Sequence, residues 1–545
     1  MKHVYLDAYK RVTTATGHTY PDVSTLLKNA MKKGALVMNF TGHGAPYSLA
    51  HEQILTLADF KEFASSNIPL WVAASCELTP YDMLMENIGE TSLLSQKGAA
   101  IAFYSSARAA YSTYNRNLNT HFMKYVLGKD SKGVRYTLGD AARLTKVALV
   151  SNIEGSIPGM RDNTSNKLKY ALMGDPAVTL QVPTYKVVID DLNGKKFTDA
   201  QQTLKAGSVA VAKGHIESPE GVKMLNFNGS LTLSLMDNLE TIVCKNNVGD
   251  AAPAHTYKER TKVLYEGSDS VVKGQFEIKI PVPLDINYSG ENGRFSLYAV
   301  SNDKTMEANG MEERFTVGGT SAESSKDSIG PAMYVYLNDP DFVDGGVVNE
   351  SPYFYAQLAD SDGINCTGIG IGHDLELIID GEEQKTYILN DYFKNDFGSY
   401  TNGTVSFRIP ALEEGQHRLF FRAWDTKNNA SSTIMNFEVK AGLAPQLVDV
   451  KATRNPASTA TTFIITYDRP ETNTKFTVDV YDCFGRLWWT HEETASTDGY
   501  YTINWNLTSN NGVALPDGLY LYKVGISCDG SEKVSKTKKL IIRKQ

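Results

Sequence analysis

The hydrophobic and polar positions of the chain follow two different patterns, and the change comes near residue 183. Over the first 182 residues, short apolar runs alternate with segments whose apolar residues recur at helical spacing. The apolar runs predict strands at 35–40, 69–75 and 99–104. The periodic segments predict helices at 21–33, 57–65, 90–96, 115–127 and 137–151. Strands separated by helices are typical of βαβ units, so an α/β domain with a parallel sheet is expected here.

From Tyr185 onward the apolar residues alternate with polar ones, as in SLTLSLMD (230–237) and HRLFFRAW (417–424). Clusters of Asn, Gly, Asp and Pro separate these runs, which is the pattern of antiparallel β-sandwiches. Two stretches rich in small and polar residues, 317–331 and 440–446, are interpreted as linkers between sandwiches. We therefore predict a multidomain chain, an α/β domain followed by three β-sandwich modules, with boundaries at 1–182, 183–325, 326–441 and 442–545.

Composition narrows the classes of function. The chain has 545 residues, 42% of them hydrophobic, and a formal net charge of -8. An acidic balance without a basic stripe argues against a nucleic-acid partner. The five cysteines are scattered without a C-x-x-C pair, so no metal site and no cofactor is predicted from them. Cys483 and Cys528 lie in the same module and could form a disulfide, which the sequence alone does not decide.

Two reactive side chains follow the ends of predicted strands. His43 stands in NFTGHGAP (39–46), directly after the strand predicted at 35–40, and Cys76 directly follows LWVAAS (70–75). The two residues are separated by one helical crossover, and such crossovers return the chain to the same edge of a parallel sheet. We therefore predict that His43 and Cys76 meet at one rim.

This pairing has a chemical use. A free thiol is mostly protonated at neutral pH, and a neighbouring imidazole can take its proton to give a nucleophile. Gly42 and Gly44 leave room for a peptide, and the backbone amides around Gly44 and Cys76 could stabilise an oxyanion. A buried cysteine at a strand end is also common without any catalytic role. The joint placement of both residues favours catalysis.

Other polar residues near these strand ends are candidates for lining a cleft. Each also has a structural interpretation, as a surface charge or a cap on the next segment. The acid that would orient His43 is not evident, and Asp7 is the one upstream candidate considered. The cleft-lining candidates are Glu52, Glu77, Ser105, Ser106 and Arg108.

Four segments of the first domain resemble the gingipain family of cysteine peptidases. They are VMNFTGHGAP (37–46), WVAASCELTPYD (71–82), GAAIAFYSSARAAYSTYN (98–115) and ALMGDPAVTL (171–180). The resemblance implies a caspase-like fold, with His43 as general base and Cys76 as nucleophile. Within the family, the chain is most similar to the sortase of the type IX secretion system. It also implies that the domain lacks its first strands.

The last module has its own resemblance. DVYDCFGRLWW (479–489) and the final KKLIIRK (538–544) are similar to the C-terminal sorting domain of type IX cargo from Bacteroidetes. By the same resemblance, residues 183–441 are immunoglobulin-like modules. Asp360 and Asp362 flank a turn at Gly363 and could bind a structural calcium ion, but the other ligands of an EF-hand loop are absent, which favours a turn.

The two resemblances together imply a cell-surface cysteine endopeptidase or transpeptidase. Its expected partners are type IX cargo proteins, outer-membrane secretion and attachment proteins, and a lipopolysaccharide amine as acyl acceptor. The opening MKHVYLDAYK lacks the apolar region of a signal peptide, so such a peptide is expected in a preceding part of the protein. The alternatives are a general secreted gingipain-like protease and a non-enzymatic surface protein.

Overall fold

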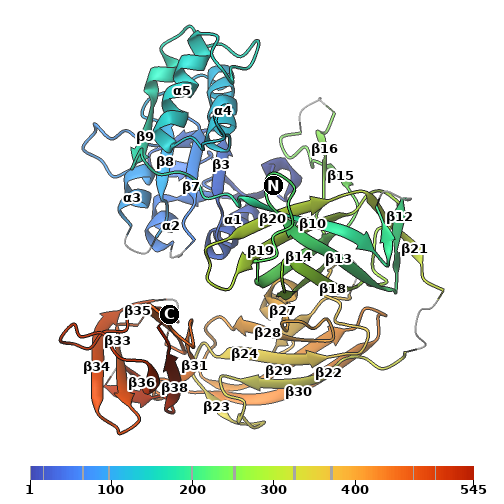
Figure 1. Cartoon of the computed structure of the whole chain (residues 1–545), viewed down its shortest axis with the longest axis vertical. Coiled ribbons are helices and arrows are strands. Elements are labelled where there is room, and N and C mark those ends of the chain that lie inside the picture. The colour runs from blue at the N-terminus through green and yellow to red at the C-terminus, as the bar shows by residue number, and fades with distance from the viewer. Residues whose placement is uncertain are drawn as a thin grey trace. The chain divides into compact units, whose positions relative to one another are not determined.

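The computed structural model describes residues 2–15, 17–63, 67–95, 98–197, 201–249, 253–322, 327–368, 372–469, 472–497, 499–528 and 530–544. Parts of four predicted segments, at 64–65, 96, 323–326 and 369–371, lie outside these described residues. The chain forms two compact units (Figure 1). The first comprises residues 1–182 and the hairpin at 240–259, and the second comprises residues 183–239 and 260–545.

The first unit is built on a four-stranded sheet in the order β3-β7-β8-β9. Strands β3, β7 and β8 run parallel, and β9 runs antiparallel to β8. The strand at the edge corrects our expectation of a purely parallel sheet. The strands are β3 (Val37–Thr41), β7 (Leu70–Ala74), β8 (Ala102–Ser106) and β9 (Tyr170–Gly174).

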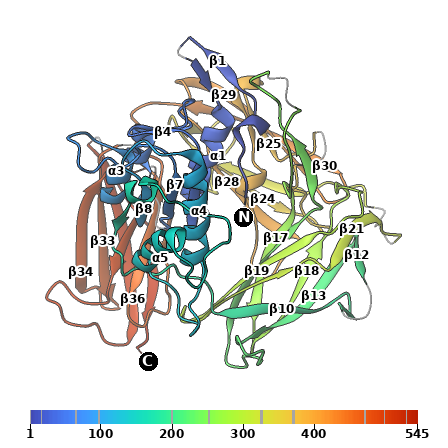
Figure 2. The same cartoon turned by 90° about the horizontal axis from the view of Figure 1, so that it is seen from above.

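Helices cover both faces of this sheet (Figure 2). Because side chains alternate along a strand, Trp71 and Ala73 of β7 face one core, and Leu70 and Val72 face the other. The first core includes residues of α1, α2 and α3, and the second includes residues of α4 and α5. The helices are α1 (Pro21–Lys33), α2 (Leu57–Glu62), α3 (Ile88–Leu94), α4 (Ser112–Val126) and α5 (Leu138–Val150).

All five predicted helices and all three predicted strands of this unit are present, with ends that differ by a few residues. Shorter elements were not predicted. They are η1 (Leu6–Ala8), β1 (Val12–Thr14), β2 (Gly17–Thr19), β4 (Gly44–Ala45), β5 (Ser48–Leu49), β6 (Leu55–Thr56) and η2 (Asn166–Lys169).

A hairpin from much later in the chain completes the first unit. It consists of β15 (Glu240–Val243) and β16 (Thr256–Glu259), paired antiparallel. The carboxylate of Asp7 accepts hydrogen bonds from the N–H groups of Asn246 and Asn247 at 2.9 and 2.7 Å. Tyr5 packs against Tyr257, with ring centroids 4.6 Å apart. The hairpin therefore holds the first residues of the peptide chain in place.

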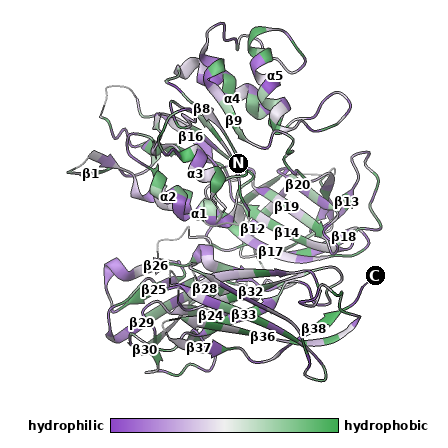
Figure 3. Cartoon of the chain, turned by 90° about the vertical axis from the view of Figure 1, so that its left-hand side faces the viewer, coloured by the Kyte–Doolittle hydropathy of each residue, from purple (hydrophilic) through white to green (hydrophobic). Residues whose placement is uncertain are grey.

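The second unit consists of β-strands around three hydrophobic cores, as the alternating pattern predicted. Figure 3 shows hydrophobic and hydrophilic residues interleaved along these strands, because one face of each sheet is buried and the other is wet. Among the described residues, no helix is long and apolar enough to cross a membrane.

The strands around the first core are β10 (Tyr185–Leu192), β11 (Lys195–Lys196), β12 (Gln202–Ala206), β13 (Val209–Glu217), β14 (Gly229–Met236), β17 (Val263–Val271), β18 (Gln275–Pro281), β19 (Arg294–Ser301), β20 (Glu307–Glu312) and β21 (Phe315–Thr320). The elements around the second are β22 (Ala332–Leu337), β23 (Val347–Val348), β24 (Tyr353–Ala359), β25 (Glu376–Ile379), η3 (Glu383–Lys385), β26 (Thr386–Ile388), η4 (Asn390–Tyr392), β27 (Phe393–Asn395), β28 (Asn402–Arg408), β29 (Gly415–Trp424) and β30 (Ala430–Val439). The strands around the third are β31 (Leu447–Ala452), β32 (Thr461–Tyr467), β33 (Thr474–Asp482), β34 (Leu487–Ala495), β35 (Tyr500–Trp505), β36 (Gly518–Cys528), β37 (Ser531–Val534) and β38 (Lys538–Ile542).

Candidate active site

The pairing register of β3 and β7 places His43 and Cys76 at equal distances beyond the carboxyl ends of these two strands. Thr41 pairs with Ala74 at the carboxyl end of the two parallel strands. His43 and Cys76 each lie two residues beyond that pair, and neighbouring strands are about 4.8 Å apart. The structure therefore places both residues at one edge of the sheet. The His43 side chain is exposed and Cys76 is half-buried.

Gly44 allows the His43 segment to lie directly against the Cys76 segment. A Cβ atom at Gly44 would come within 2.4 Å of the Ser75 Oγ atom and 3.0 Å of the Leu78 side chain. Ser75 is fully buried and directly precedes Cys76. The second glycine of G-H-G is therefore favoured by close packing beside Cys76, because any larger residue there would force the Ser75 or Leu78 side chain to move.

The thiol of Cys76 contacts the backbone of Ala110. The Sγ atom lies 3.2 Å from the Ala110 N–H group that donates to it and 3.3 Å from the Ala110 carbonyl. Among the described residues, no acceptor bonds to the N–H of Cys76 itself, whereas the N–H of Glu77 donates to the Arg108 carbonyl. The Ala110 backbone therefore both donates to and accepts from the thiol, and the unbonded N–H of Cys76 is a donor for an oxyanion.

The backbone of residues 107–111, which includes Ala110, is held by hydrogen bonds to the segment before β9. The Ala107 N–H donates to the Lys169 carbonyl at 2.9 Å, and the Lys169 Nζ donates to the Ala109 carbonyl at 2.6 Å. The Tyr111 N–H donates to the Oδ1 of the fully buried Asn166 at 2.9 Å. These bonds fix the backbone that contacts the thiol.

Comparison with known proteins identifies the domain that carries this site. The model of peptidase family C25 matches residues 1–181. Residues 1–181 are a peptidase family C25 domain. This is the gingipain family, as the sequence motifs indicated, and its members are cysteine peptidases, which membership implies for this domain.

Solved structures give two further likenesses. The dimeric latent PorU from Porphyromonas gingivalis is 32% identical over 82% of this chain, with a TM-score of 0.36, and the chain spans 41% of that protein's length. The Arg-specific cysteine proteinase gingipain R is 14% identical over 54% of this chain and 56% of its own, with a TM-score of 0.25. No curated protein matches the chain.

Two of the predicted cleft residues of the C25 domain are in its interior. Ser105 and Ser106 are fully buried, and their hydroxyls donate to the carbonyls of Ala73 and Arg108 at 3.1 and 2.6 Å. The prediction that these side chains line a cleft is wrong. The hydroxyls instead satisfy backbone acceptors at the strand end, where the ladder of sheet hydrogen bonds stops.

Arg108 and Glu77 are exposed, as the prediction of surface or cleft positions requires. The Arg108 guanidinium donates to both carboxylate oxygens of Asp82, at 2.9 and 2.5 Å, and so holds the pKa of Asp82 below its usual range. This pair ties the loop after β8 to the loop after β7. Glu77 has a φ of 50°, a left-handed conformation that is unfavourable for its side-chain type, directly after Cys76.

Asp7 does not orient His43. Both of its carboxylate oxygens accept backbone N–H groups of the hairpin at 240–259, so the suggestion from the sequence is wrong. Glu52 is half-buried and lies near the Tyr20 hydroxyl, and after burial its charge is the largest contribution that raises the Tyr20 pKa. A place for Glu52 in a cleft stays a prediction.

The residue next to Glu52 was missed in the sequence. The rings of His43 and His51 lie with centroids 4.7 Å apart and planes tilted by 59°. Among the described residues, no hydrogen bond or ion pair joins His43 to a carboxylate. Nothing in the sequence pattern distinguishes His51, because the contact depends on how the loop folds back.

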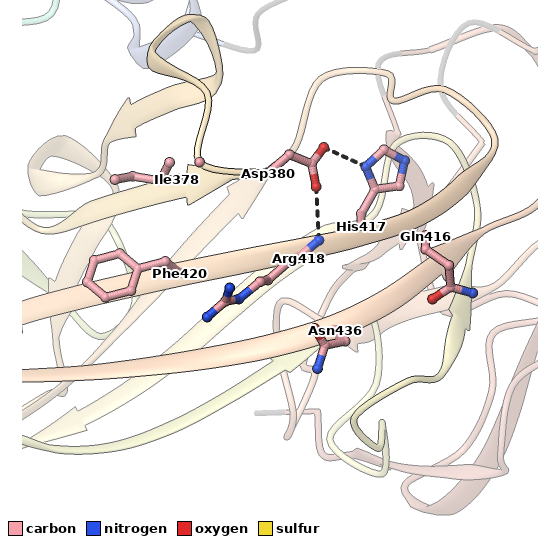
Figure 4. A pocket seen from close by; sticks show the side chains of 8 residues that line it. Ile378, Asp380, Gln416, His417, Arg418, Phe420 and Asn436 are labelled. Carbon is pink, nitrogen blue, oxygen red and sulfur yellow. Dashed lines mark hydrogen bonds and ion pairs between the residues drawn. The ribbon is translucent and has the colours of Figure 1, made fainter.

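A His–Asp pair in the β region lines a pocket of about 590 Å³ (Figure 4). The His417 Nδ1 lies 2.8 Å from Asp380 and its Nε2 lies 2.8 Å from the Glu413 carbonyl. Asp380 also accepts the Arg418 N–H at 2.9 Å. Both ring nitrogens are occupied by acceptors, so this pair links β29 to the turn after β25 and leaves no nitrogen for a substrate.

Three carboxylates gather in the second β region. Oxygens of Asp327, Asp360 and Asp425 lie within 4.8 Å of one another. Burial, with repulsion from the neighbouring carboxylates, raises the pKa of Asp360 to about 6. Asp360 also accepts the Asp362 N–H at 2.8 Å, which is the turn that the sequence favoured.

The cysteines other than Cys76 differ in accessibility. Burial raises the pKa of Cys366 to about 12 and also raises the pKa of Cys244. Cys483 is exposed and Cys528 is buried, and no disulfide joins the two. Of the four, Cys483 is therefore the thiol open to a reagent.

Proposed function

We propose that this protein is a cell-surface cysteine endopeptidase or transpeptidase that acts as a type IX sortase. The observation that carries the proposal is the register of β3 and β7, which sets His43 and Cys76 level at one edge of a C25 domain. In this proposal Cys76 is the nucleophile and His43 the general base.

The reaction follows from these two groups. His43 takes the proton of the Cys76 thiol, and the thiolate attacks the carbonyl carbon of a peptide bond. The C–N bond breaks, and His43 returns the proton to the leaving amine. A thioester remains on Cys76. Water, or an amine activated by His43, attacks this thioester and regenerates the thiol.

The oxyanion that forms during each attack needs donors close to the sulfur. The N–H of Cys76 is free of other acceptors among the described residues. The N–H of Gly44 is the second donor proposed, because the close packing of Gly44 on Ser75 brings its backbone beside Cys76. Two fixed backbone donors cost no reorganisation when the charge develops.

The proposed substrates are type IX cargo proteins, cut before their C-terminal sorting domain. Support comes from the motifs of residues 442–545, which are similar to such a domain, and from the likeness to PorU. The acyl group would pass to water or to a lipopolysaccharide amine, with outer-membrane secretion proteins as partners. In the same proposal the C25 domain is caspase-like and the β-modules at 183–325 and 326–441 are immunoglobulin-like.

Two other functions remain as alternatives. A general secreted gingipain-like protease would use the same His43 and Cys76 but digest unrelated proteins. A non-enzymatic surface protein would carry the C25 domain without an active dyad. The free N–H of Cys76 and the fixed contact at Ala110 favour an enzyme.

Acylation of Cys76 tests the proposal. The whole chain, with Cys483→Ser to remove the exposed competing thiol, is incubated with a thiol-directed acyl probe, beside Cys76→Ala and His43→Ala versions. We expect label on Cys76 that is absent in Cys76→Ala and slowed about a hundredfold or more in His43→Ala. A Cys76 that reacts at the same rate without His43 would contradict the dyad.

The substrate is tested separately. A fusion that ends in residues 442–545 is offered together with an unfolded general substrate such as casein. Cleavage of the fusion just before the module, with casein intact, supports the sortase. Cleavage of casein alone supports the general protease.

A further inference from the structure

We propose that His51 is a positioning residue that holds the His43 imidazole in its catalytic orientation. The proposal rests on the proposed role of His43 as general base. His51 contributes an aromatic ring in contact with His43 and takes no part in proton transfer. The relevant observations are the ring contact, the fold of the loop that carries His51, and the surroundings of His43.

The ring contact is close and has a definite geometry. The two centroids are 4.7 Å apart, and the planes are tilted by 59°. Aromatic rings attract one another at such distances when they are tilted. An exposed imidazole otherwise moves among several rotamers, so this contact restricts a side chain that must stay aligned.

The loop that carries His51 is built to face His43. The Ala50 N–H donates to the carbonyl of His43 itself at 2.9 Å. Ala50 and Gln53, on either side of His51, have φ values of 62° and 51°, and Ala50 is buried. Non-glycine residues rarely adopt this left-handed conformation, and such strain persists where the surrounding structure imposes it.

The residues of this loop that face the core of the domain are also held in place. Leu49, Ile54 and Leu55 are buried in the core beneath α1 and α2. Glu52 lies near the hydroxyl of the buried Tyr20. His51 is therefore the side chain of a fixed loop that contacts the base.

A polar side chain such as that of His51 suits an exposed position. The position is exposed, and an imidazole combines an aromatic ring in contact with His43 with the polarity that an exposed position favours. A phenylalanine would keep the ring contact at the cost of an exposed apolar surface. This difference gives a conservative variant that separates ring packing from the chemistry of the nitrogens.

The experiment compares His51→Ala, His51→Phe, His43→Ala and the parent chain, all with Cys483→Ser. The readouts are the rate of Cys76 acylation by the same probe and the thermal unfolding midpoint. His18→Ala is the matched control, because His18 is an exposed ring on the β1–β2 hairpin that forms a hydrogen bond with Thr13. We expect His51→Ala to slow acylation about tenfold through misalignment of the base, with the unfolding midpoint unchanged.

His51→Phe should restore most of the lost rate, and His18→Ala should match the parent. The proposal is overturned if His51→Ala acylates at the parent rate, or if His51→Phe is as slow as His51→Ala. Should His51→Ala also unfold at a lower temperature, the NMR signals of the His43 ring in folded His51→Phe decide: parent-like signals support the proposal, and shifted signals overturn it. If His43→Ala keeps the parent rate, the dyad fails instead, whatever His51 does.

Discussion

Gly44 is the residue at which the base segment and the nucleophile segment approach most closely. Its α-carbon faces the hydroxyl of the buried Ser75, at a distance that leaves no room for a methyl group. The two glycines that flank His43 therefore differ in how closely they are packed. A Cβ at Gly42 would meet the end of the Phe40 ring at 3.0 Å, and a ring can move aside.

We predict that Gly44→Ala slows acylation of Cys76 about a hundredfold, because it pushes His43 and Cys76 apart by a fraction of an ångström to an ångström. Gly42→Ala is the matched control and should have a much smaller effect. The rate of labelling by the acyl probe measures both. Equal rates in the two variants would show that the packing on Ser75 does not set the dyad.

Asp360 gives a prediction on pH. Its pKa is about 6 in the folded protein, against an ordinary value of 3.8, because burial and nearby carboxylates disfavour its charge. A group whose pKa is raised on folding is favoured when protonated, so its ionisation costs stability as the pH rises through about 4 to 6.

Asp360→Asn should therefore raise the unfolding midpoint above pH 6, and this gain should vanish near pH 4. Asparagine keeps an oxygen that can accept the Asp362 N–H. Unfolding followed between pH 4 and 7.5 checks this, with the exposed Asp341→Asn as control. A gain that is the same at every pH would point to a cause other than ionisation.

At the scale of elements, one buried amide joins two segments of the C25 domain. Asn166 accepts the Tyr111 N–H at the start of α4 and donates to the Asn115 side chain at 3.1 Å. It belongs to η2, the segment before β9, which also anchors the backbone beside Cys76.

Asn166→Ala should lower the free energy of unfolding by about 1–3 kcal/mol, because it leaves the Tyr111 N–H and the buried amide of Asn115 without these partners. Denaturant unfolding measures this loss. Asn163→Ala, an exposed asparagine three residues away, is the control and should cost little. Equal losses would mean that the Asn166 bonds are not the cause.

The elements also show what the sequence can predict. The helix at 21–33 and the strand at 69–75 were predicted because their apolar spacing is strong and local. β9 was not predicted as a strand, and its antiparallel direction could not be, because pairing direction depends on the path of the chain and leaves no local pattern. The same reason applies to Ser105 and Ser106, since polar residues at a strand end look accessible until their backbone partners are known.

The candidate dyad was predictable from sequence because a glycine-flanked histidine and a cysteine both followed apolar strands. The residues around the candidate dyad were harder to predict from the sequence. His51 and Ala110 reach it through loop geometry, and Asp7 is used by a hairpin more than 230 residues later. Long-range contacts of this kind have no periodic signature.

At the scale of the whole molecule, the boundary of the first unit is not a point in the sequence. Residues 240–259 belong to this unit although they are inserted between β14 and β17 of the β region. The Asp7 carboxylate and the Tyr5 ring hold the hairpin.

Asp7→Ala should increase cleavage within residues 240–259 by a protease under native conditions, because two backbone N–H groups lose their acceptor. Limited proteolysis with mass spectrometry measures this, and Lys10→Ala, an exposed neighbour, is the control. An unchanged cleavage rate in Asp7→Ala would show that the hairpin is held by other contacts.

The hairpin at 240–259 also constrains how such a protein can be rearranged by evolution or by design. A C25 domain exchanged or copied as residues 1–182 would lose its partner for Asp7, and the β-module left behind would keep a hairpin without its binding surface. The two segments must therefore be inherited together. A functional unit of this kind is recombined by moving a discontinuous set of residues, and not by cutting the gene at one place.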